Sequence, residues 1–152
     1  MKKLMISILF LAACIPAWAN DGIETIQSKH SFKETVDRLD KLLAAKGITV
    51  FAKFDHAAEA QKVGLSLRPT LVYAVGNPKA GTGIMVKSPL AAIDLPLKIL
   101  VSEDGDGKVW LSYNAAEYLS KRHSIPEDAS KPLGAARAIS SEVAGQAAIQ
   151  SK

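Results

Sequence analysis

Cysteine is nearly absent from this chain of 152 residues, which contains only Cys14. Cys14 falls in the N-terminal segment that we interpret below as an export leader, so the mature chain can form no disulfide. Without paired cysteines the sequence also has no local signature of a cysteine-based zinc site. Stability must come from packing, and the residues after position 19 are numerous enough for one hydrophobic core.

Signatures of catalysis and of metal binding are missing as well. The three histidines, His30, His56 and His123, occur in no H-x-x-x-H or H-E-x-x-H spacing. No G-x-S-x-G serine motif occurs, and the absence of C-x-x-C-H argues against covalent haem attachment. A site assembled from distant segments stays open, so the sequence leaves open whether the protein is an enzyme.

The N-terminus has the pattern of a signal peptide. Residues 1–19 combine a lysine-bearing start, a short apolar run and the small-x-small sequence Ala17-Trp18-Ala19, which predicts cleavage before Asn20. The apolar run is too short to span a membrane. An alternative is a lipobox ending at Cys14, which would leave a lipid-anchored protein. We therefore predict export to the periplasm or beyond, with lipid anchoring as the alternative.

Net charge is modest and belongs partly to this leader. The chain has 19 basic and 15 acidic residues, a net charge of +4, and the leader holds two of the lysines and no acid. The mature protein is therefore left with about +2, which is too little to predict a nucleic-acid partner. No transmembrane span is predicted.

Hydrophobic periodicity divides the first half of the chain into recognisable elements. After a weak strand at 22–28, Ser31-x-x-Glu34 forms a capping box that opens a helix ending at Gly47. The helix should bury a stripe made of Val36, Leu39 and Leu43. A strand at 48–54 follows, with Ile48, Val50, Ala52 and Phe54 on its core face. Asp55 then caps a short helix, and Pro69 marks the start of the next strand.

The stretch from Leu71 to Pro96 organises the chain. A β-forming run at 71–75 leads into Gly76-Asn77-Pro78, and Gly81-Thr82-Gly83 opens a short helix at 84–87. With Thr82 as N-cap, the free N–H groups of Gly83 and Ile84 could hold a carboxylate or small oxyanion. The alternative is a tight turn without a ligand. A nucleotide-binding P-loop is excluded because Thr82 and Gly83 replace its lysine and its Ser/Thr.

The second half of the sequence predicts a β-hairpin and two helices. The strands at 97–101 and 108–113 flank Glu103-Asp104-Gly105-Asp106-Gly107, which has turn composition and lacks the spaced ligands of a calcium loop. Asn114 should cap the next helix, and a last helix should run from Pro132 to about Gly145. The element order predicts an α+β fold, a mainly antiparallel sheet with helices on one face. The predicted segments are a signal peptide (1–19), a strand region (20–30), a core (31–125) and a helical tail (126–152).

Several of these motifs, in this order, resemble a known family. Those motifs are Arg68-Pro69-Thr70-Leu71, Gly76-Asn77-Pro78, Ala92-Ile93-Asp94-Leu95-Pro96-Leu97 and Val109-Trp110-Leu111-Ser112-Tyr113. Together they resemble the bacterial and archaeal domain of unknown function 302, across roughly Phe32 to Ile125. The resemblance implies an α+β fold with TBP-like topology and commonly a homodimer. It implies no settled activity.

Six residues are candidates for a ligand site: His56, Asn77, Gly81, Thr82, Gly83 and Asp94. His56 follows Asp55 at a strand-to-helix corner, where it could serve as ligand or general base, or could bond backbone carbonyls. Asp94 interrupts an apolar line and is expected to be anchored by backbone N–H groups or by Arg68, ahead of a catalytic role. Met85 and the histidines leave non-covalent haem as a further possibility.

The favoured interpretation is a dimeric periplasmic protein that binds a small molecule or anion, or serves as an accessory protein. The first alternative is an enzyme that uses His56 and Asp94 as an acid/base pair on a small molecule. A haem-binding protein and a purely structural dimer remain further alternatives. Convergence of the six candidate residues on one cavity would favour a binding site.

Overall fold

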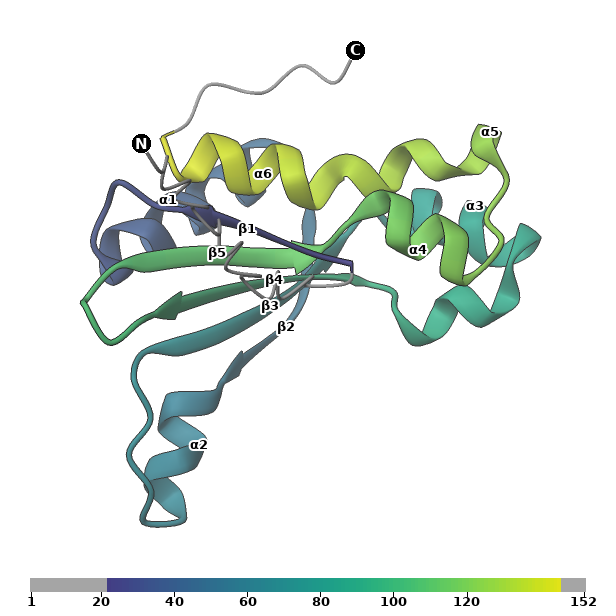
Figure 1. Ribbon diagram of the computed structural model, residues 1–152. Helices are drawn as coiled ribbons and strands as arrows, with labels where there is room; N and C mark the ends of the chain where they lie inside the picture. The colour runs from purple at the N-terminus through teal and green to yellow at the C-terminus, as the bar shows by residue number, and fades with distance from the viewer. Residues whose placement is uncertain (1–21, 146–152) are drawn as a thin grey trace, which may run out of the picture.

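The computed structural model describes residues 22–145, so the predicted leader, Cys14 and the predicted start at Asn20 lie outside the described residues. Five antiparallel strands form one sheet in the order β1-β5-β4-β3-β2 (Figure 1). The strands are β1 (Ile23–Gln27), β2 (Thr49–Asp55), β3 (Thr70–Gly76), β4 (Leu97–Glu103) and β5 (Val109–Asn114). The α-helices are α1 (Phe32–Ala45), α2 (His56–Lys62), α3 (Pro78–Lys87), α4 (Ala116–Arg122), α5 (Glu127–Ser130) and α6 (Ala135–Val143). Two 3-10 helices complete the set, η1 (Pro89–Ile93) and η2 (Lys131–Gly134).

One face of the sheet carries the hydrophobic core. Along β4 and β5 every second side chain is buried, as strand alternation requires when one face is covered. Helices α1 and α6 lie across that face (Figure 1) and bring Leu39, Leu43, Ile139 and Val143 into the core. The predicted α+β class, with helices packed on one face of an antiparallel sheet, is confirmed.

Helix α1 follows its predicted phase. The Ser31 hydroxyl accepts a hydrogen bond from the Glu34 N–H at 3.3 Å, which caps the helix as expected. Leu39 and Leu43 are fully buried, and Val36 packs at the edge of the core. The apolar stripe at helical spacing therefore gave the correct buried face.

Strand β2 departs from the predicted alternation. Its register against β3 shifts between Val50 and Ala52, which makes Phe51 an extra residue. Lys53 consequently lies on the helix-covered face, where its ammonium bonds Asp40 of α1 at 2.7 Å. Phe54 is 52% exposed and lies on the opposite face. The predicted core face of β2 was wrong beyond Val50, because a bulge in an edge strand reverses the alternation.

Helix α2 forms an arm that extends away from the sheet (Figure 1). Asp55 caps it as predicted, since its carboxylate accepts the Ala58 N–H at 2.9 Å. The chain returns from the arm through Val63, Leu65 and Leu67, all exposed. We call the sheet surface opposite α1 and α6 the open face. Register and alternation put Phe54, Val72, Leu100 and Trp110 on it.

The predicted hairpin forms between β4 and β5. The Asp104 carboxylate accepts the N–H groups of Asp106 and Lys108 and the Trp110 indole N–H, the last at 2.7 Å. These bonds, that of Trp110 foremost, lower the pKa of Asp104. The acidic loop is thus a turn held by one carboxylate that satisfies three donors.

Two predicted helix starts need correction. Asn114 is the last residue of β5 and pairs with Ile23, so Ala115 takes the N-cap position of α4 without a side-chain bond. Pro132 lies in η2, and α6 begins at Ala135. Asn114 therefore belongs to a strand and Pro132 to a 3-10 helix, although the local sequence pattern assigned each of them to the start of an α-helix.

Candidate functional site

Helix α3 begins five residues earlier than the glycine pattern predicted, with Asn77 and not Thr82 as its N-cap. The Asn77 side chain accepts the Ala80 N–H at 3.2 Å, and Pro78 occupies the first helical position, which suits a residue without an N–H. Gly81 N–H bonds the Asn77 carbonyl at 2.9 Å, so the glycines lie inside the helix. The prediction that Thr82 caps the helix was therefore wrong. The N–H groups of Gly83 and Ile84 lie within helical turns and do not form an open anion cradle.

A cavity of about 350 Å³ lies beside this first part of α3. It is bounded by the end of β3, the start of β4, the η2 segment and α6, and we call it the α3–α6 cavity. Its size is at the lower end of the range typical of small-molecule pockets. The lining residues are Ile48, Phe51, Val75, Gly76, Asn77, Pro78, Ala80, Gly81, Thr82, Ile84, Met85, Leu95, Pro96, Leu97, Pro132, Leu133, Ala135 and Ile139.

Gly81 leaves part of this space open. An ideal Cβ built on Gly81 would meet no heavy atom within 4 Å outside its own helix and neighbours. Because Gly81 lines the cavity, a side chain there would project into otherwise empty space. Gly83 offers equally open space but does not line the cavity. It borders an adjoining surface depression with Lys79 and Lys87.

The structure brings together part of the predicted site. Asn77, Gly81 and Thr82 line the α3–α6 cavity, whereas His56 and Asp94 do not. His56 follows the end of β2, which pairs with the start of β3, while Asp94 precedes β4, whose start pairs with the end of β3. The two side chains therefore lie at opposite ends of a strand about 20 Å long. The hypothesis of a His56–Asp94 acid/base pair is not supported within one protomer.

Asp94 is held by two side chains that local sequence reasoning did not assign to it. Its Oδ2 lies 2.5 Å from His123 Nε2 and 3.1 Å from Arg122 Nε. The His123 side chain is only 6% exposed, so this contact ties the end of η1 to the end of α4. The prediction that Asp94 is anchored is confirmed, but the expected partner, Arg68, lies beside Gly105 instead.

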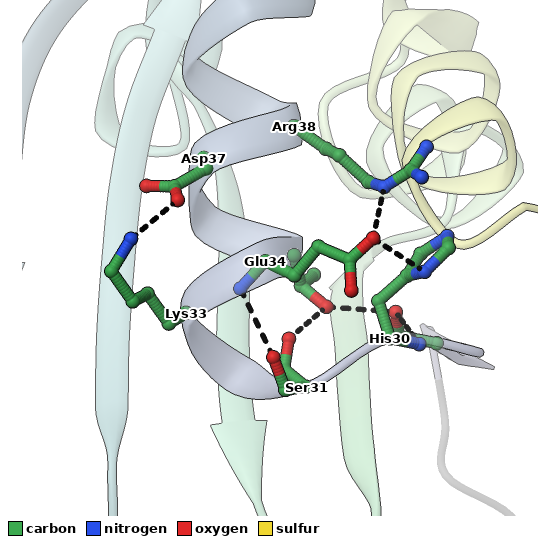
Figure 2. A network of polar contacts seen from close by, with 8 residues as sticks. His30, Ser31, Lys33, Glu34, Asp37 and Arg38 are labelled. Carbon is green, nitrogen blue, oxygen red and sulfur yellow. Dashed lines mark hydrogen bonds and ion pairs between the residues drawn. The ribbon is translucent and has the colours of Figure 1, made fainter.

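His30 is partly buried beside the start of α1. Figure 2 shows it at the start of α1, where its Nδ1 lies 3.1 Å from Glu34, which also accepts from Arg38. Its Nε2 is buried and has no hydrogen-bond partner among the described residues. The network holds the entry into α1 and is remote from the α3–α6 cavity lining.

Two buried tyrosines anchor the helix layer to the sheet. Tyr73 donates to Asp40 at 3.0 Å, and Tyr113 donates to Glu24 at 2.8 Å. Burial, reinforced by these carboxylates, raises the pKa of both phenols. Glu24, Tyr113 and Arg137 also line a smaller, polar cavity of about 190 Å³. Since these groups bond one another, their arrangement serves packing of α6 and β1.

The structure offers little for a metal or for haem. Among residues 22–145 no group of three or more His, Cys, Asp or Glu side chains is placed to hold a metal ion. Met85 is the one lining residue of the α3–α6 cavity that could ligate haem iron, and its described lining has no cation to meet the propionates. The residues present do not fit haem, and we derive nothing from it.

Sequence reasoning missed the distant walls of the cavity. Phe51 reaches it because of the β2 bulge, and Leu133 and Ile139 come from the C-terminal segment. The sequence predicted a helix in this segment, but nothing local indicated that the helix would close over α3.

Comparison with known proteins identifies the family. Residues 24–143 match the family described as "Domain of unknown function DUF302". The crystal structure of an uncharacterized conserved DUF302 protein from Bacillus stearothermophilus superposes with a TM-score of 0.66 and 21% identity, covering 82% of this chain and 94% of that one. That likeness supports the fold.

Two curated relatives carry a functional name. "Fluoride-specific ion channel FluC 1" of Brucella suis biovar 1 (strain 1330) is 41% identical over 106 residues, which is 70% of this chain and 42% of that protein. "Fluoride-specific ion channel FluC 2" of Brucella melitensis biotype 1 shows the same identity over 106 residues, and the match covers 39% of that protein. This chain thus spans about two fifths of those relatives. Within residues 22–145 no helix is long and apolar enough to cross a bilayer. With its family match over 120 positions from 24 to 143, the chain belongs to the DUF302 family.

Proposed function

We propose that this protein is an exported, dimeric small-molecule-binding or accessory protein, and that its ligand occupies the α3–α6 cavity. The observation that carries the proposal is the cavity itself, about 350 Å³ bordered by the first turns of α3. Its lining is mainly apolar with two polar side chains, a composition typical of small-molecule sites. Asn77, Gly81 and Thr82, three of the residues singled out from sequence, border it.

The names of the Brucella relatives suggest only an accessory role. Those relatives are named as fluoride-specific ion channels, and the match covers about two fifths of each protein. The α3–α6 cavity is apolar and its described lining has no cation, so it suits no free fluoride ion. We therefore propose a ligand-binding module that can accompany such a channel, and assign no conduction to this chain.

A ligand screen tests the binding proposal. A ligand that binds only the folded state raises the melting temperature by mass action. Neutral and charged metabolites should be screened by thermal denaturation against the mature protein, Gly81→Leu and Gly83→Leu. Gly81→Leu adds a bulky side chain at a residue that lines the cavity, whereas Gly83→Leu makes the same change on the same helix at a residue that does not line it. Any hit that stabilises the wild type and Gly83→Leu but not Gly81→Leu supports the proposal; hits indifferent to Gly81→Leu refute it.

Export is tested separately by mass. Intact-mass analysis of the exported protein should give a chain that begins at Asn20. An acylated Cys14 would replace this with membrane anchoring, and a full-length cytoplasmic chain would contradict export.

A second observation favours self-association through the open face. Phe54, Val72 and Leu100 form one row across β2, β3 and β4 on the side away from α1 and α6. The neighbouring arm presents Val63 at 71% and Leu65 at 67% exposure. Phe54 is 52% exposed, while Val72 and Leu100 are half-buried. Apolar surface gathered in this way is typical of an interface. A second copy would place the same row and arm on both sides of a two-fold interface.

Sedimentation of charged variants tests the dimer. Phe54→Asp and Leu65→Asp should yield monomers, because a carboxylate desolvated in an apolar interface has no partner. Val86→Asp is the matched control, since Val86 is 76% exposed on α3, away from the open face. A wild type that is monomeric at tens of micromolar, or a dimer unaffected by Phe54→Asp and Leu65→Asp, would contradict this interface.

A further inference from the structure

The composition of the cavity wall restricts what can bind there. Eighteen residues line the α3–α6 cavity, and this lining contains no Asp, Glu, Lys, Arg or His. An ion moved from water into such surroundings loses its hydration and gains no counter-charge. A charged ligand is therefore disfavoured, including the carboxylate or oxyanion that the glycine pattern suggested.

Polarity is concentrated on one side of the cavity. Asn77 and Thr82 are the two lining residues with hydrogen-bonding side chains, and both are exposed on α3. The Asn77 carbonyl oxygen is already used as the helix cap, which leaves its amide N–H₂ and the Thr82 hydroxyl for a ligand. The deeper wall is formed by buried Val75, Ile84 and Leu133.

Size sets the scale of the ligand. An apolar cavity of about 150 Å³ accepts benzene, so one of 350 Å³ has room for a molecule of two rings. The absence of a Cβ at Gly81 contributes to that room, because no heavy atom outside its own helix approaches its ideal Cβ within 4 Å.

We infer that the α3–α6 cavity takes an uncharged, mainly apolar molecule of about two rings, with one hydroxyl or carbonyl directed at Thr82 and Asn77. This inference rests on the proposed function and specifies the ligand class of the same site. The apolar part lies against the deep wall, and the single polar group stays at the exposed side, where it can bond the protein or water.

A series of naphthalenes with different head groups tests the ligand class. The neutral two-ring fluorophore 1-naphthylamine serves as the probe on the mature protein. Naphthalene, 1-naphthol, 1-naphthoate and 1-naphthylmethylammonium then compete with it at pH 7. We expect the two neutral compounds to bind at least tenfold more tightly than the two ions, because the cavity gives an ion no partner. 1-Naphthol should exceed naphthalene by about fivefold, the worth of one hydrogen bond.

Three variants locate the binding. Gly81→Leu should abolish probe binding, and Gly83→Leu should leave it unchanged. Thr82→Val keeps the side-chain shape but removes the hydroxyl, so it should reduce the preference for 1-naphthol over naphthalene while naphthalene affinity stays the same. Urea melts of each variant establish that it is folded.

The outcomes distinguish the proposed function of the cavity as a binding site from the inferred ligand class. If 1-naphthoate or 1-naphthylmethylammonium binds most tightly and Gly81→Leu abolishes that binding, the site stands and the inferred ligand class is wrong. If no compound binds the folded wild type, or Gly81→Leu binds the probe as well as the wild type, the proposed function of the cavity fails as well. An unchanged preference for 1-naphthol in Thr82→Val overturns the assigned polar contact.

Discussion

At the scale of single residues, the most consequential groups are the two tyrosines that link sheet and helices. Tyr73 is fully buried, and Lys53 lies over its ring at 4.7 Å while bonding the same Asp40 that accepts the phenol. Tyr113 donates to Glu24, and Glu24 in turn pairs with Arg137 at 3.7 Å. In each case burial and an adjacent carboxylate favour the neutral phenol, which raises the pKa.

This arrangement predicts how stability falls in alkali. The folded state keeps the two phenolic protons to higher pH than the unfolded chain, whose tyrosines titrate near pH 10. The stabilisation is fully present below pH 10 and is lost as pH rises above it. Each tyrosine should lower the free energy of unfolding by about 1.4 kcal/mol per pH unit there.

Urea melts from pH 9 to 11 measure that slope in the wild type, Tyr73→Phe, Tyr113→Phe and the double variant. Each single variant should lose about half of the tyrosine-dependent slope. A double variant with the wild-type slope would show that these phenols are not the groups responsible.

Single residues also mark where sequence reasoning ended. The anchoring of Asp94 was predictable from its place in an apolar line, but His123 and Arg122 lie about thirty positions later and reach it only through the packing of α4 on η1. His56 has suitable chemistry for a site, but it lies at the opposite end of β3 from Asp94. Residue type indicated possible chemistry, and only topology decided which residues meet.

At the scale of elements, helix α3 shows how two strong signals competed. Gly81 and Gly83 suggested a loop, while Asn77-Pro78 is a good N-cap followed by a good first helical residue. The helix begins at the Asn77 cap, and the two glycines lie inside it, where they lower its stability. Glycine inside a helix is about 0.5–1 kcal/mol less favourable than alanine.

Three substitutions in α3 test this account. Asn77→Ala should cost about 1 kcal/mol because it removes the cap. Gly81→Ala should stabilise the protein by about 0.5–1 kcal/mol, since its Cβ has space and the unfolded chain loses entropy. Thr82→Ala should change stability by less than about 0.5 kcal/mol. Denaturant melts give the order, and a larger loss for Thr82→Ala than for Asn77→Ala would restore the original prediction of the cap.

Helix α1 provides the element predicted best. Leu39→Ala should cost about 2–5 kcal/mol because the side chain is fully buried, and Lys41→Ala should be nearly neutral because that residue is exposed. Equal losses in denaturant melts would mean that the helix presents a different face. Its phase was readable because a fourteen-residue helix with a local cap depends on few distant contacts.

At the scale of the whole molecule, the sheet and its covering helices followed from alternation and periodicity, whereas the cavity did not. Its walls come from the β2 bulge, the start of α3, the segment before β4 and the η2–α6 segment. Each of these segments has an ordinary local pattern. The cavity exists because these segments meet without filling the volume beside Gly81. A single sequence has no pattern that predicts such unfilled volume.

Met85 offers the most direct test of the claim that this cavity binds a ligand. Of the three methionines, Met1 and Met5 fall in the predicted leader, so Met85 is the one methionine of the mature chain and it lines the cavity. Protein labelled with ¹³C at the methionine methyl, after removal of any start methionine, should give one methyl resonance. We predict that 1-naphthol shifts this resonance saturably in the wild type and in Gly83→Leu, and leaves it in place in folded Gly81→Leu. A Met85 resonance that does not move in the wild type, or moves equally in Gly81→Leu, would contradict the assignment of the α3–α6 cavity as the binding site.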